Sequence, residues 1–289
     1  MSEITWKSML KRYPLNQSPL YRLRGKGQFA SVLGITFAES TQLAESNSYR
    51  VFDNQKNREI QHPTGRLKVI HGRIAALLKR IELPDYVVSQ KGRSYVDNAR
   101  MHVGPTPLVK TDVSKFYPST THAMVWRMFS KFFECADDIA GQLADICCYS
   151  QRHLPTGSPL SGYVAFFASQ PMFDEVNDRA VASGCLMTLF VDDIAISGER
   201  ANKQLLTQVR HVVRDHGHRT KNKKSLTFAA TAVKTVTGVV VTAAEVKLPN
   251  RRHRAIHAAR RQLSTAPAID TLLLTKQLAG RIQEARQIL

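Results

Sequence analysis

The segment Leu189-Phe-Val-Asp-Asp-Ile-Ala-Ile196 places two adjacent carboxylates between two apolar stretches. The runs 186–190 and 194–197 predict two short buried strands, joined by a tight turn at 191–193. Neighbouring acids in such a turn repel each other, so the fold gains little from Asp192 and Asp193 alone. A divalent cation would make the pair favourable, because Mg²⁺ prefers hard oxygen ligands. The alternative is an exposed Asp-Asp turn, which is what most isolated pairs of this kind are.

A third acid, Asp112, stands at the end of another apolar run, 108–113, which predicts a buried strand. Two metal ions about 3.5–4 Å apart can activate an attacking hydroxyl and stabilise a leaving phosphate oxygen. The three carboxylates together therefore predict a metal centre for phosphoryl chemistry.

The remaining pattern predicts an α+β fold in which helices cover a mainly antiparallel sheet. Further strands are expected at 49–52 and 233–242. Apolar residues at helical spacing predict helices at 67–81, 121–133, 137–149, from about 159 past 173, 205–213, and in the tail from 251 onward.

Charge is the main compositional signal of these 289 residues. Lysine and arginine number 41 against 23 acids, a net charge of +18, which favours a polyanionic partner such as nucleic acid. No apolar run reaches the roughly 20 residues of a membrane helix, so no membrane association is expected. The four cysteines lack C-x-x-C spacing and are expected to be free thiols in a core. Basic clusters at 219–224 and 251–261 are candidate phosphate contacts, with solvated helix faces as the alternative.

Three motifs in order resemble those of bacterial reverse transcriptases. They are Asp112-Val-Ser-Lys-Phe-Tyr-Pro-Ser119, Leu154-Pro-Thr-Gly157 and Phe190-Val-Asp-Asp193. Two more, Asn98-Ala-x-x-His102 and Val236-Thr-Gly238, resemble signatures of retron reverse transcriptases. Those enzymes copy part of their own structured RNA into single-stranded DNA that stays joined to RNA through a 2′,5′ branch.

The resemblance covers the chain from about residue 49 to its end, and it implies a right-hand polymerase fold. An N-terminal region and fingers would occupy 1–105. The palm, with its antiparallel sheet, would occupy 106–247 and carry a helical insertion at about 120–155. A short helical thumb would occupy 248–289.

The same resemblance implies roles for individual residues. Asp112 and Asp192 would hold two Mg²⁺ ions, with Mn²⁺ as an alternative, assisted by Asp193 and the Val113 carbonyl. Arg58 would pair with the triphosphate, Tyr117 would exclude a ribose 2′-hydroxyl, and Lys224 would protonate the departing pyrophosphate. The remaining residues implied in nucleotide binding are Gly157 and Ser158. Those implied in RNA binding are Asn98, His102, Val236, Thr237, Gly238, Arg251, Arg252 and Arg254.

Structural alternatives stand beside several of these roles. Asn98 could be a turn residue, His102 a surface histidine, Tyr117 a core aromatic, and 236–238 a strand with a glycine bulge. The sequence also departs from the family pattern. Phe190 replaces a tyrosine and Thr156 a glutamine, which bears on fidelity and primer grip but removes no metal ligand.

The resemblance implies an RNA-directed DNA polymerase of a retron in the bacterial cytoplasm. Its partners would be a cognate non-coding RNA serving as template and primer, deoxynucleoside triphosphates, the branched DNA product (msDNA), and a separate effector protein in anti-phage defence. The alternatives are a non-retron defence-associated reverse transcriptase, a template-independent polymerase, and a catalytically inactive nucleic-acid-binding scaffold.

Overall fold

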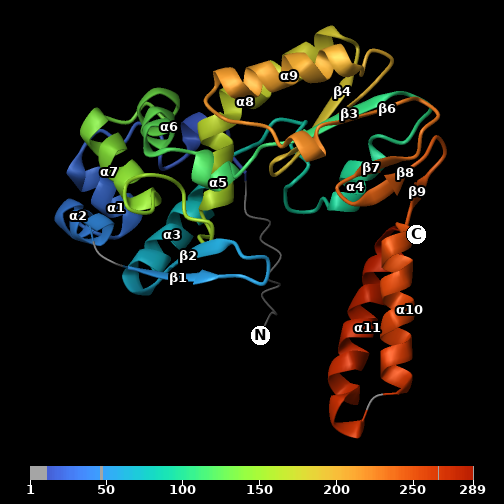
Figure 1. Ribbon diagram of the computed structural model, residues 1–289. Coiled ribbons are helices and arrows are strands. Elements are labelled where there is room, and N and C mark those ends of the chain that lie inside the picture. Colours follow the sequence, from blue (N-terminus) through green and yellow to red (C-terminus); the bar gives the residue numbers. More distant parts are fainter. Residues whose placement is uncertain (1–11, 46–47, 266, 289) are drawn as a thin grey trace, which may run out of the picture. The chain divides into compact units, whose positions relative to one another are not determined.

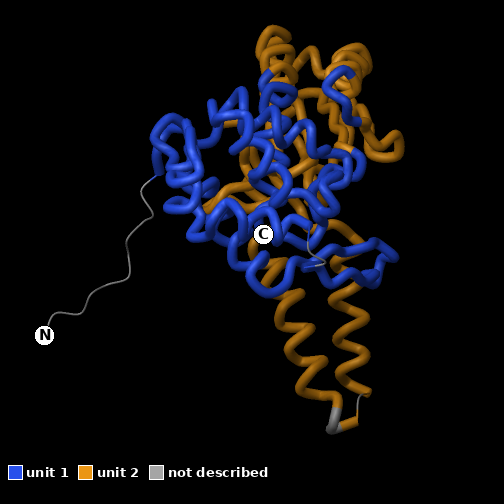
Figure 2. The backbone as a smooth tube through the Cα atoms, turned by 90° about the vertical axis from the view of Figure 1, so that its left-hand side faces the viewer, with its two compact units in different colours: residues 1–84, 114–174, 215–218 blue, residues 85–113, 175–214, 219–289 orange. Residues whose placement is uncertain are grey.

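The computed structural model of the chain describes residues 12–45, 48–265 and 267–288. These residues form two compact units, each assembled from separate segments of the chain (Figure 2). Within the described residues, unit 1 comprises 12–84, 114–174 and 215–218, and unit 2 comprises 85–113, 175–214 and 219–288. The chain therefore passes from one unit to the other five times.

Unit 1 is mainly helical and contains one two-stranded antiparallel hairpin, β1 (Tyr49–Asp53) with β2 (Glu59–Pro63). Its helical elements are η1 (Leu15–Gln17), α1 (Lys26–Leu33), α2 (Phe37–Glu45), α3 (Gly65–Leu78), α5 (Phe116–Ser119), α6 (His122–Arg127), η2 (Met128–Phe132), α7 (Asp137–Cys147) and the first part of α8 (Ser161–Ala182). The helix predicted over 121–133 is confirmed as α6, which continues into a π-helical turn at η2.

Periodic apolar residues give unit 1 its core. Leu67, Ile70, Ile74 and Leu78 recur on one face of α3 and are all buried, as their helical spacing predicts. Aromatic rings fill the space between helices, with Phe129 and Phe133 fully buried and 5.5 Å apart.

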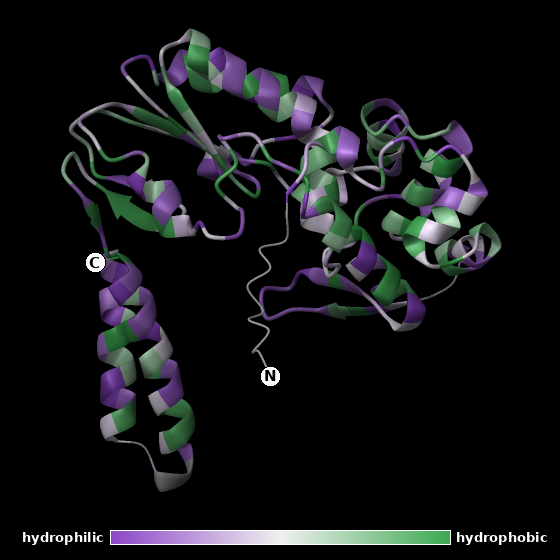
Figure 3. Cartoon of the chain, turned by 180° about the vertical axis from the view of Figure 1, so that it is seen from behind, coloured by the Kyte–Doolittle hydropathy of each residue, from purple (hydrophilic) through white to green (hydrophobic). Residues whose placement is uncertain are grey.

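Unit 2 contains a four-stranded antiparallel sheet in the order β4-β5-β3-β6. Its strands are β3 (Leu108–Asp112), β4 (Leu186–Phe190), β5 (Asp193–Ser197) and β6 (Leu226–Phe228). The helix α9 (Lys203–Asp215) runs along one side of the sheet, with purple and green residues alternating along it (Figures 1 and 3). The predicted antiparallel sheet with covering helices is confirmed.

A smaller sheet, β7 (Lys234–Val236), β8 (Val239–Val241) and β9 (Val246–Lys247), packs with α4 (Tyr95–Arg100). The helix α4 begins at a capping box, in which Ser94 Oγ accepts from the Asp97 amide and Asp97 Oδ2 accepts from the Ser94 amide. The prediction of one strand over 233–242 is wrong. Thr237 and Gly238 both have positive φ, 45° and 80°, which turns the chain back in a two-residue hairpin.

The last helices, α10 (Asn250–Ser264) and α11 (Ala268–Ile288), run antiparallel (Figure 1). Leu274, Leu278 and Ile282 of α11 are partly buried, whereas Leu273 is 60% exposed. The 3₁₀ turn η3 (Asn222–Lys224) lies between α9 and β6. All four cysteines are buried and free, as predicted. Among the described residues, no helix is long and apolar enough to cross a membrane.

Candidate active site

The three predicted carboxylates meet in unit 2, where β3 and β5 lie side by side. Asp112 pairs directly with Asp193 across the two strands. The Val113 amide donates a hydrogen bond of 3.0 Å to the Asp192 carbonyl, which brings the turn residue to the end of β3. One carboxylate oxygen from each of the three acids lies within 4.8 Å of the others. Residues far apart in the sequence thus form one acidic cluster.

A strained turn sets the position of Asp192. Val191 precedes it with φ of 61°, a conformation that a β-branched residue rarely adopts and that costs about 1–3 kcal/mol. The Val191 amide donates a hydrogen bond of 3.1 Å to Ser89 Oγ, which helps to fix the turn. Strain of this kind persists only where surrounding contacts impose it, and here it accompanies the acidic cluster.

Burial makes the negative charges of this cluster costly. Burial, reinforced by repulsion from Asp112 and Asp193, raises the pKa of Asp192 to about 6. Burial also raises the pKa of Asp193, and this outweighs the opposing effect of Lys224. For Asp112, burial alone would raise the pKa, but hydrogen bonds from Lys221 and Lys224 lower it below its ordinary value.

Two lysines neutralise Asp112, whose side chain is only 1% exposed. Lys221 Nζ lies 2.6 Å from Asp112 Oδ1, and Lys224 Nζ contacts Asp112 Oδ2 and lies 3.7 Å from Asp193 Oδ1. Lys224 is a predicted residue, whereas Lys221 is not. The sequence signal for Lys221 is its place in the basic run 219–224, three residues before Lys224.

A divalent cation fits this cluster. Its donors are carboxylate oxygens, the hard ligands that Mg²⁺ and similar ions prefer, and they lie close enough to share one ion. Burial raises the pKa of Asp192 and of Asp193, and a bound cation would offset the cost of burying their charges. Asp112, Asp192 and Asp193 could therefore hold a divalent metal ion.

The predicted nucleotide-binding residues other than Lys224 lie in unit 1. A Cβ on Gly157 would lie 2.8 Å from the carbonyl oxygen of Gln61, so only glycine fits against β2 at this position. The Gly157 carbonyl also accepts a hydrogen bond of 3.1 Å from His62 Nδ1. The close approach seen at Gly157 is thus to the backbone of β2.

Ser158 is held by a buried histidine. Its hydroxyl donates to His71 Nδ1 at 2.7 Å, and His71 Nε2 donates to the Ile146 carbonyl at 2.9 Å. Burial lowers the pKa of His71 to about 4, so the ring is neutral and one nitrogen can accept. Arg58 is exposed in the β1–β2 turn, where its amide donates to Asn54 Oδ1. Tyr117 lies on α5 with its ring centroid 5.9 Å from that of Phe116.

Several predicted RNA-binding residues converge in unit 2. Thr237 Oγ1 donates a hydrogen bond of 2.6 Å to the Tyr95 carbonyl on α4. Arg252 donates to the Tyr95 hydroxyl at 3.1 Å and lies 3.1 Å from Glu284 of α11. A Cβ on Gly238 would approach Arg251 Nη2 to 3.0 Å. The β7–β8 turn, α4 and the start of α10 therefore form one contact layer, while Arg254 is exposed on α10.

Asn98 lies buried in the helix α4 and His102 is buried, so the alternatives of a turn asparagine and a surface histidine are wrong. His102 bridges the larger sheet, with Nδ1 2.7 Å from Ser197 Oγ and Nε2 2.7 Å from Thr188 Oγ1. The Asn98 amide is fully buried and has no hydrogen-bond partner among the described residues. Val236 is likewise buried, in the cluster behind the β7–β8 turn. The assignment of Asn98, His102 and Val236 to RNA binding stays a prediction. Since all three side chains are buried, they would affect RNA binding through the packing of the protein.

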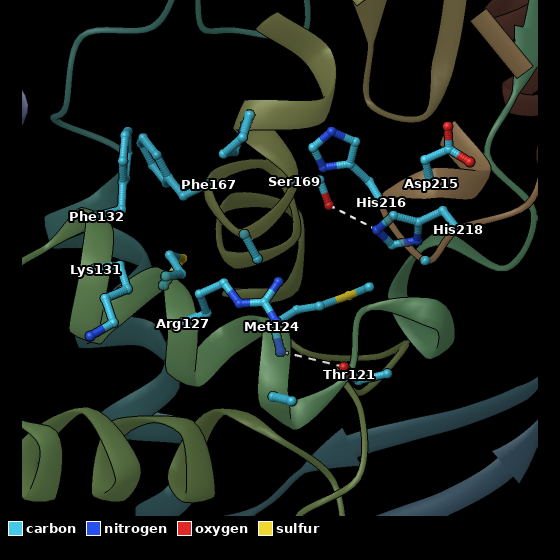
Figure 4. A pocket seen from close by; sticks show the side chains of 15 residues that line it. Thr121, Met124, Arg127, Lys131, Phe132, Phe167, Ser169, Asp215, His216 and His218 are labelled. Carbon is cyan, nitrogen blue, oxygen red and sulfur yellow. Dashed lines mark hydrogen bonds between the residues drawn. The ribbon is translucent and has the colours of Figure 1, made fainter. Parts of the chain in front are cut away.

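Unit 1 also contains a pocket of about 540 Å³ beside α6 and α8 (Figure 4). Its walls combine apolar side chains such as Met124 and Phe167 with the cations Arg127 and Lys131. His218 closes one side, where its ring contacts Ser119 Oγ at 2.8 Å and Ser169 Oγ at 3.1 Å. This pocket contains none of the predicted site residues.

Comparisons with known proteins agree with these motifs. The model of the family described as reverse transcriptase (RNA-dependent DNA polymerase) matches residues 46–247. Retron Ec86 reverse transcriptase of Escherichia coli is 24% identical over 220 residues, covering 73% of this chain and 68% of that protein. Retron Se72 reverse transcriptase of Salmonella heidelberg is 28% identical over 165 residues, covering 54% of this chain and 42% of that protein. The match thus spans only about two thirds of the first relative and less than half of the second.

Among solved structures, telomerase from Candida albicans in complex with a TWJ fragment of telomeric RNA matches with a TM-score of 0.51. The identity is 9%, and the match covers 83% of this chain and 56% of that one. These matches confirm the predicted resemblance to retron reverse transcriptases and the predicted right-hand polymerase fold.

Proposed function

The chain belongs to the reverse transcriptase (RNA-dependent DNA polymerase) family, and on that premise we propose that it is the polymerase of a bacterial retron. In this role it copies a cognate structured non-coding RNA into msDNA from deoxynucleoside triphosphates. The observation that carries the proposal is the cluster of Asp112, Asp192 and Asp193 on paired strands, within reach of a shared cation.

Asp112, Asp192, Asp193 and the Val113 carbonyl are the proposed metal-holding groups. When bound, two Mg²⁺ ions, or Mn²⁺ in their place, would neutralise charge on the phosphates and favour ionisation of the primer hydroxyl. Lys224 is the proposed proton donor to the departing pyrophosphate. Burial alone would lower its pKa, but its hydrogen bond to Asp112 and the nearby carboxylates raise it, which keeps the ammonium protonated.

The proposed nucleotide contacts come from unit 1. The Arg58 guanidinium suits two phosphate oxygens in a fork. The Tyr117 ring is the proposed barrier to a ribose 2′-hydroxyl. Gly157 and Ser158 are proposed to shape the pocket, and the packing of Gly157 on β2 together with the His71–Ser158 hydrogen bond supports a rigid loop there.

RNA selection is proposed for the layer built from α4, the β7–β8 turn and the start of α10. The contacts of Thr237 with the Tyr95 carbonyl and of Arg252 with the Tyr95 hydroxyl support this, because they join one retron-like signature and a basic cluster at a single residue of α4. Arg251 and Arg254 are exposed cations beside that layer. Fingers, palm and thumb are proposed at 1–105, 106–247 and 248–289.

The biological setting is also part of the proposal. Synthesis would begin at a guanosine 2′-hydroxyl of the RNA and leave a 2′,5′ branch. The protein, its RNA and msDNA would act in the bacterial cytoplasm with a separate effector protein in anti-phage defence. Net charge of +18 supports a stable association with nucleic acid.

The nucleic acid that copurifies with the protein from its native locus tests this proposal. It is treated with RNase and then with a debranching enzyme, and compared with that of the Asp192→Asn/Asp193→Asn variant. We expect a discrete single-stranded DNA that shortens on debranching and is absent from the variant, which should still bind RNA.

Each other outcome points elsewhere. DNA without a branch would indicate a different class of bacterial reverse transcriptase. RNA alone from both proteins would favour an inactive scaffold, and synthesis retained by the double variant would remove the metal assignment.

A further inference from the structure

A basic groove lies in unit 2, along the solvent side of α9. Arg210, His211 and Arg214 line it from the helix, and Arg219, Thr220 and Asn222 line it from the segment that follows. The groove has a volume of about 540 Å³, and no described acidic residue lines it. It is separate from the carboxylate cluster, none of whose residues lines it.

The helix presents its groove-lining residues in a single stripe. Residues 207, 210, 211 and 214 recur at three- and four-residue spacing and are all exposed. The opposite face buries five aliphatic side chains, Leu205, Leu206, Val209, Val212 and Val213. The polar side of α9 therefore faces the groove, and its apolar side packs on the core.

Arg210 is already held in position. Its Nε donates a hydrogen bond of 3.1 Å to Thr220 Oγ1, and its Nη2 donates one of 2.6 Å to Asn222 Oδ1. A guanidinium fixed by its own structure loses little further freedom when it contacts a phosphate. The groove is thus partly organised before any ligand arrives.

We propose that this groove binds the phosphodiester backbone of RNA outside the active site. Cationic and hydroxyl side chains are those that contact phosphate oxygens, and these contacts position a nucleic acid without reading its sequence. No phenylalanine, tyrosine or tryptophan is among the lining residues, so the groove lacks the usual platform for a base. Its cations and hydroxyls therefore favour a nucleic-acid backbone over a mononucleotide.

The groove shares a short segment with the carboxylate cluster. Thr220 and Asn222 face Arg210, while Lys221 between them lies 2.6 Å from Asp112. The Lys221 amide also donates to the Asp112 carbonyl at 3.0 Å. Changes at Arg210, Thr220 or Asn222 would therefore disturb Asp112, so the test uses the other arginines.

The test compares Arg214→Gln/Arg219→Gln with the control Arg200→Gln/Lys203→Gln, which removes the same charge from exposed positions of unit 2 outside the groove. Affinity for a fluorescein-labelled RNA hairpin with a single-stranded 3′ extension is measured by anisotropy over a series of salt concentrations. EDTA is present and nucleotides are absent, so no synthesis occurs. Each lost phosphate contact should reduce the slope of log affinity against log salt by about 0.7–0.9.

We expect the groove variant to lose about 10-fold in affinity and to have a slope shallower by about 1–2, with the control close to wild type. Arg214→Lys/Arg219→Lys should restore the slope, because it restores the charge. Equal slopes in the groove and control variants would overturn the proposal. So would displacement of the groove-dependent binding by millimolar AMP or inorganic phosphate, which would indicate a small-anion site.

A second measurement needs no variant. Wild-type protein is treated with phenylglyoxal with and without the hairpin, and modified arginines are located by mass spectrometry. Arg214 and Arg219 should be protected by the RNA while Arg200 is not, and equal modification with and without RNA would contradict the groove.

Discussion

At the scale of single residues, Tyr117 offers the sharpest test of the nucleotide site. Tyr117→Ala removes the ring proposed to collide with a ribose 2′-hydroxyl, so the enzyme should accept ribonucleotides more readily. We expect the preference for deoxynucleotides to fall by about 10–100-fold, the range that one steric contact supplies. Single-nucleotide extension of a DNA primer on an RNA template, with dGTP or GTP as substrate, measures this ratio.

The control for that change is Tyr117→Phe, which keeps the ring and should keep the preference. If Tyr117→Ala discriminates sugars as wild type does, Tyr117 is a packing residue beside Phe116 and the gate lies elsewhere.

His102 makes the stability of the fold depend on acid. Burial, followed by repulsion from Lys234, lowers the pKa of His102 to about 4 in the folded protein, below its ordinary value of 6.5. The unfolded chain therefore takes up this proton first as the pH falls below about 6.5. Stability contributed by neutral His102 is complete above that pH and is progressively lost down to about pH 4.

His102→Gln should remove this acid sensitivity while weakening the protein at neutral pH, because the contacts with Ser197 and Thr188 are lost. Between about pH 7.5 and about pH 5.5, its free energy of unfolding should fall by about 1 kcal/mol less than that of wild type. Urea unfolding at the two pH values measures the difference. The control is His257→Gln, a change at an exposed position that should leave the pH dependence of wild-type stability intact. Equal losses of stability in wild type and His102→Gln would contradict the role of His102 in acid sensitivity.

At the scale of elements, α11 completes the core behind α4 and the smaller sheet. Ile288 is 1% exposed and joins Val96, Val236 and Val239 in one buried cluster. Ile288→Ala should lower the free energy of unfolding by about 2–4 kcal/mol, through lost burial and the cavity it leaves. Denaturant unfolding measures this, with Leu272→Ala as the control because Leu272 is 68% exposed. Equal effects of the two changes would show that α11 does not depend on this contact.

How far an element could be predicted depended on whether local residues determine it. The strands β3, β4 and β5 were predictable from apolar runs, and the acids at their ends can be read from the same segments of the sequence. The break at Thr237 and Gly238 does not, because a threonine at positive φ has no sequence signature, although the glycine beside it is a turn signal. The four-residue helix α5 is also too brief to show periodicity, and β2 has no apolar run because Ile60 is its only aliphatic residue besides Pro63.

Side-chain partners were the least predictable part of the candidate site. Asp112, Asp192 and Asp193 were expected together, and the structure brings them together. The pairing of Lys221 with Asp112 depends on how η3 lies against β3, which no local pattern encodes. The burial of Asn98 and His102 likewise depends on sheets formed by distant segments.

At the scale of the whole molecule, the two units should unfold in a single cooperative transition, because each is built from interleaved segments of the chain. Unfolding either unit frees chain segments that run directly into the other, so the two should lose structure together. Cys135 in unit 1 and Cys185 in unit 2 are both buried and report on each unit separately. Pulse labelling with a maleimide over a urea series, read by mass spectrometry, should give the same midpoint for both thiols. Distinct midpoints would show that the units unfold independently.

The packing of Ile288 behind α4 has a consequence for folding during translation. Val96 and Ala99 emerge from the ribosome long before Ile288, and at about 5–20 residues per second the delay is roughly 10–40 s. During that interval the nascent chain can already pair the strands that carry Asp112, Asp192 and Asp193, while the apolar side of α4 still lacks its last partners. The nascent polymerase thus forms its acidic cluster before it completes the layer proposed to select its RNA. Chaperones that bind exposed apolar surfaces would therefore act on a chain whose acidic cluster is already formed.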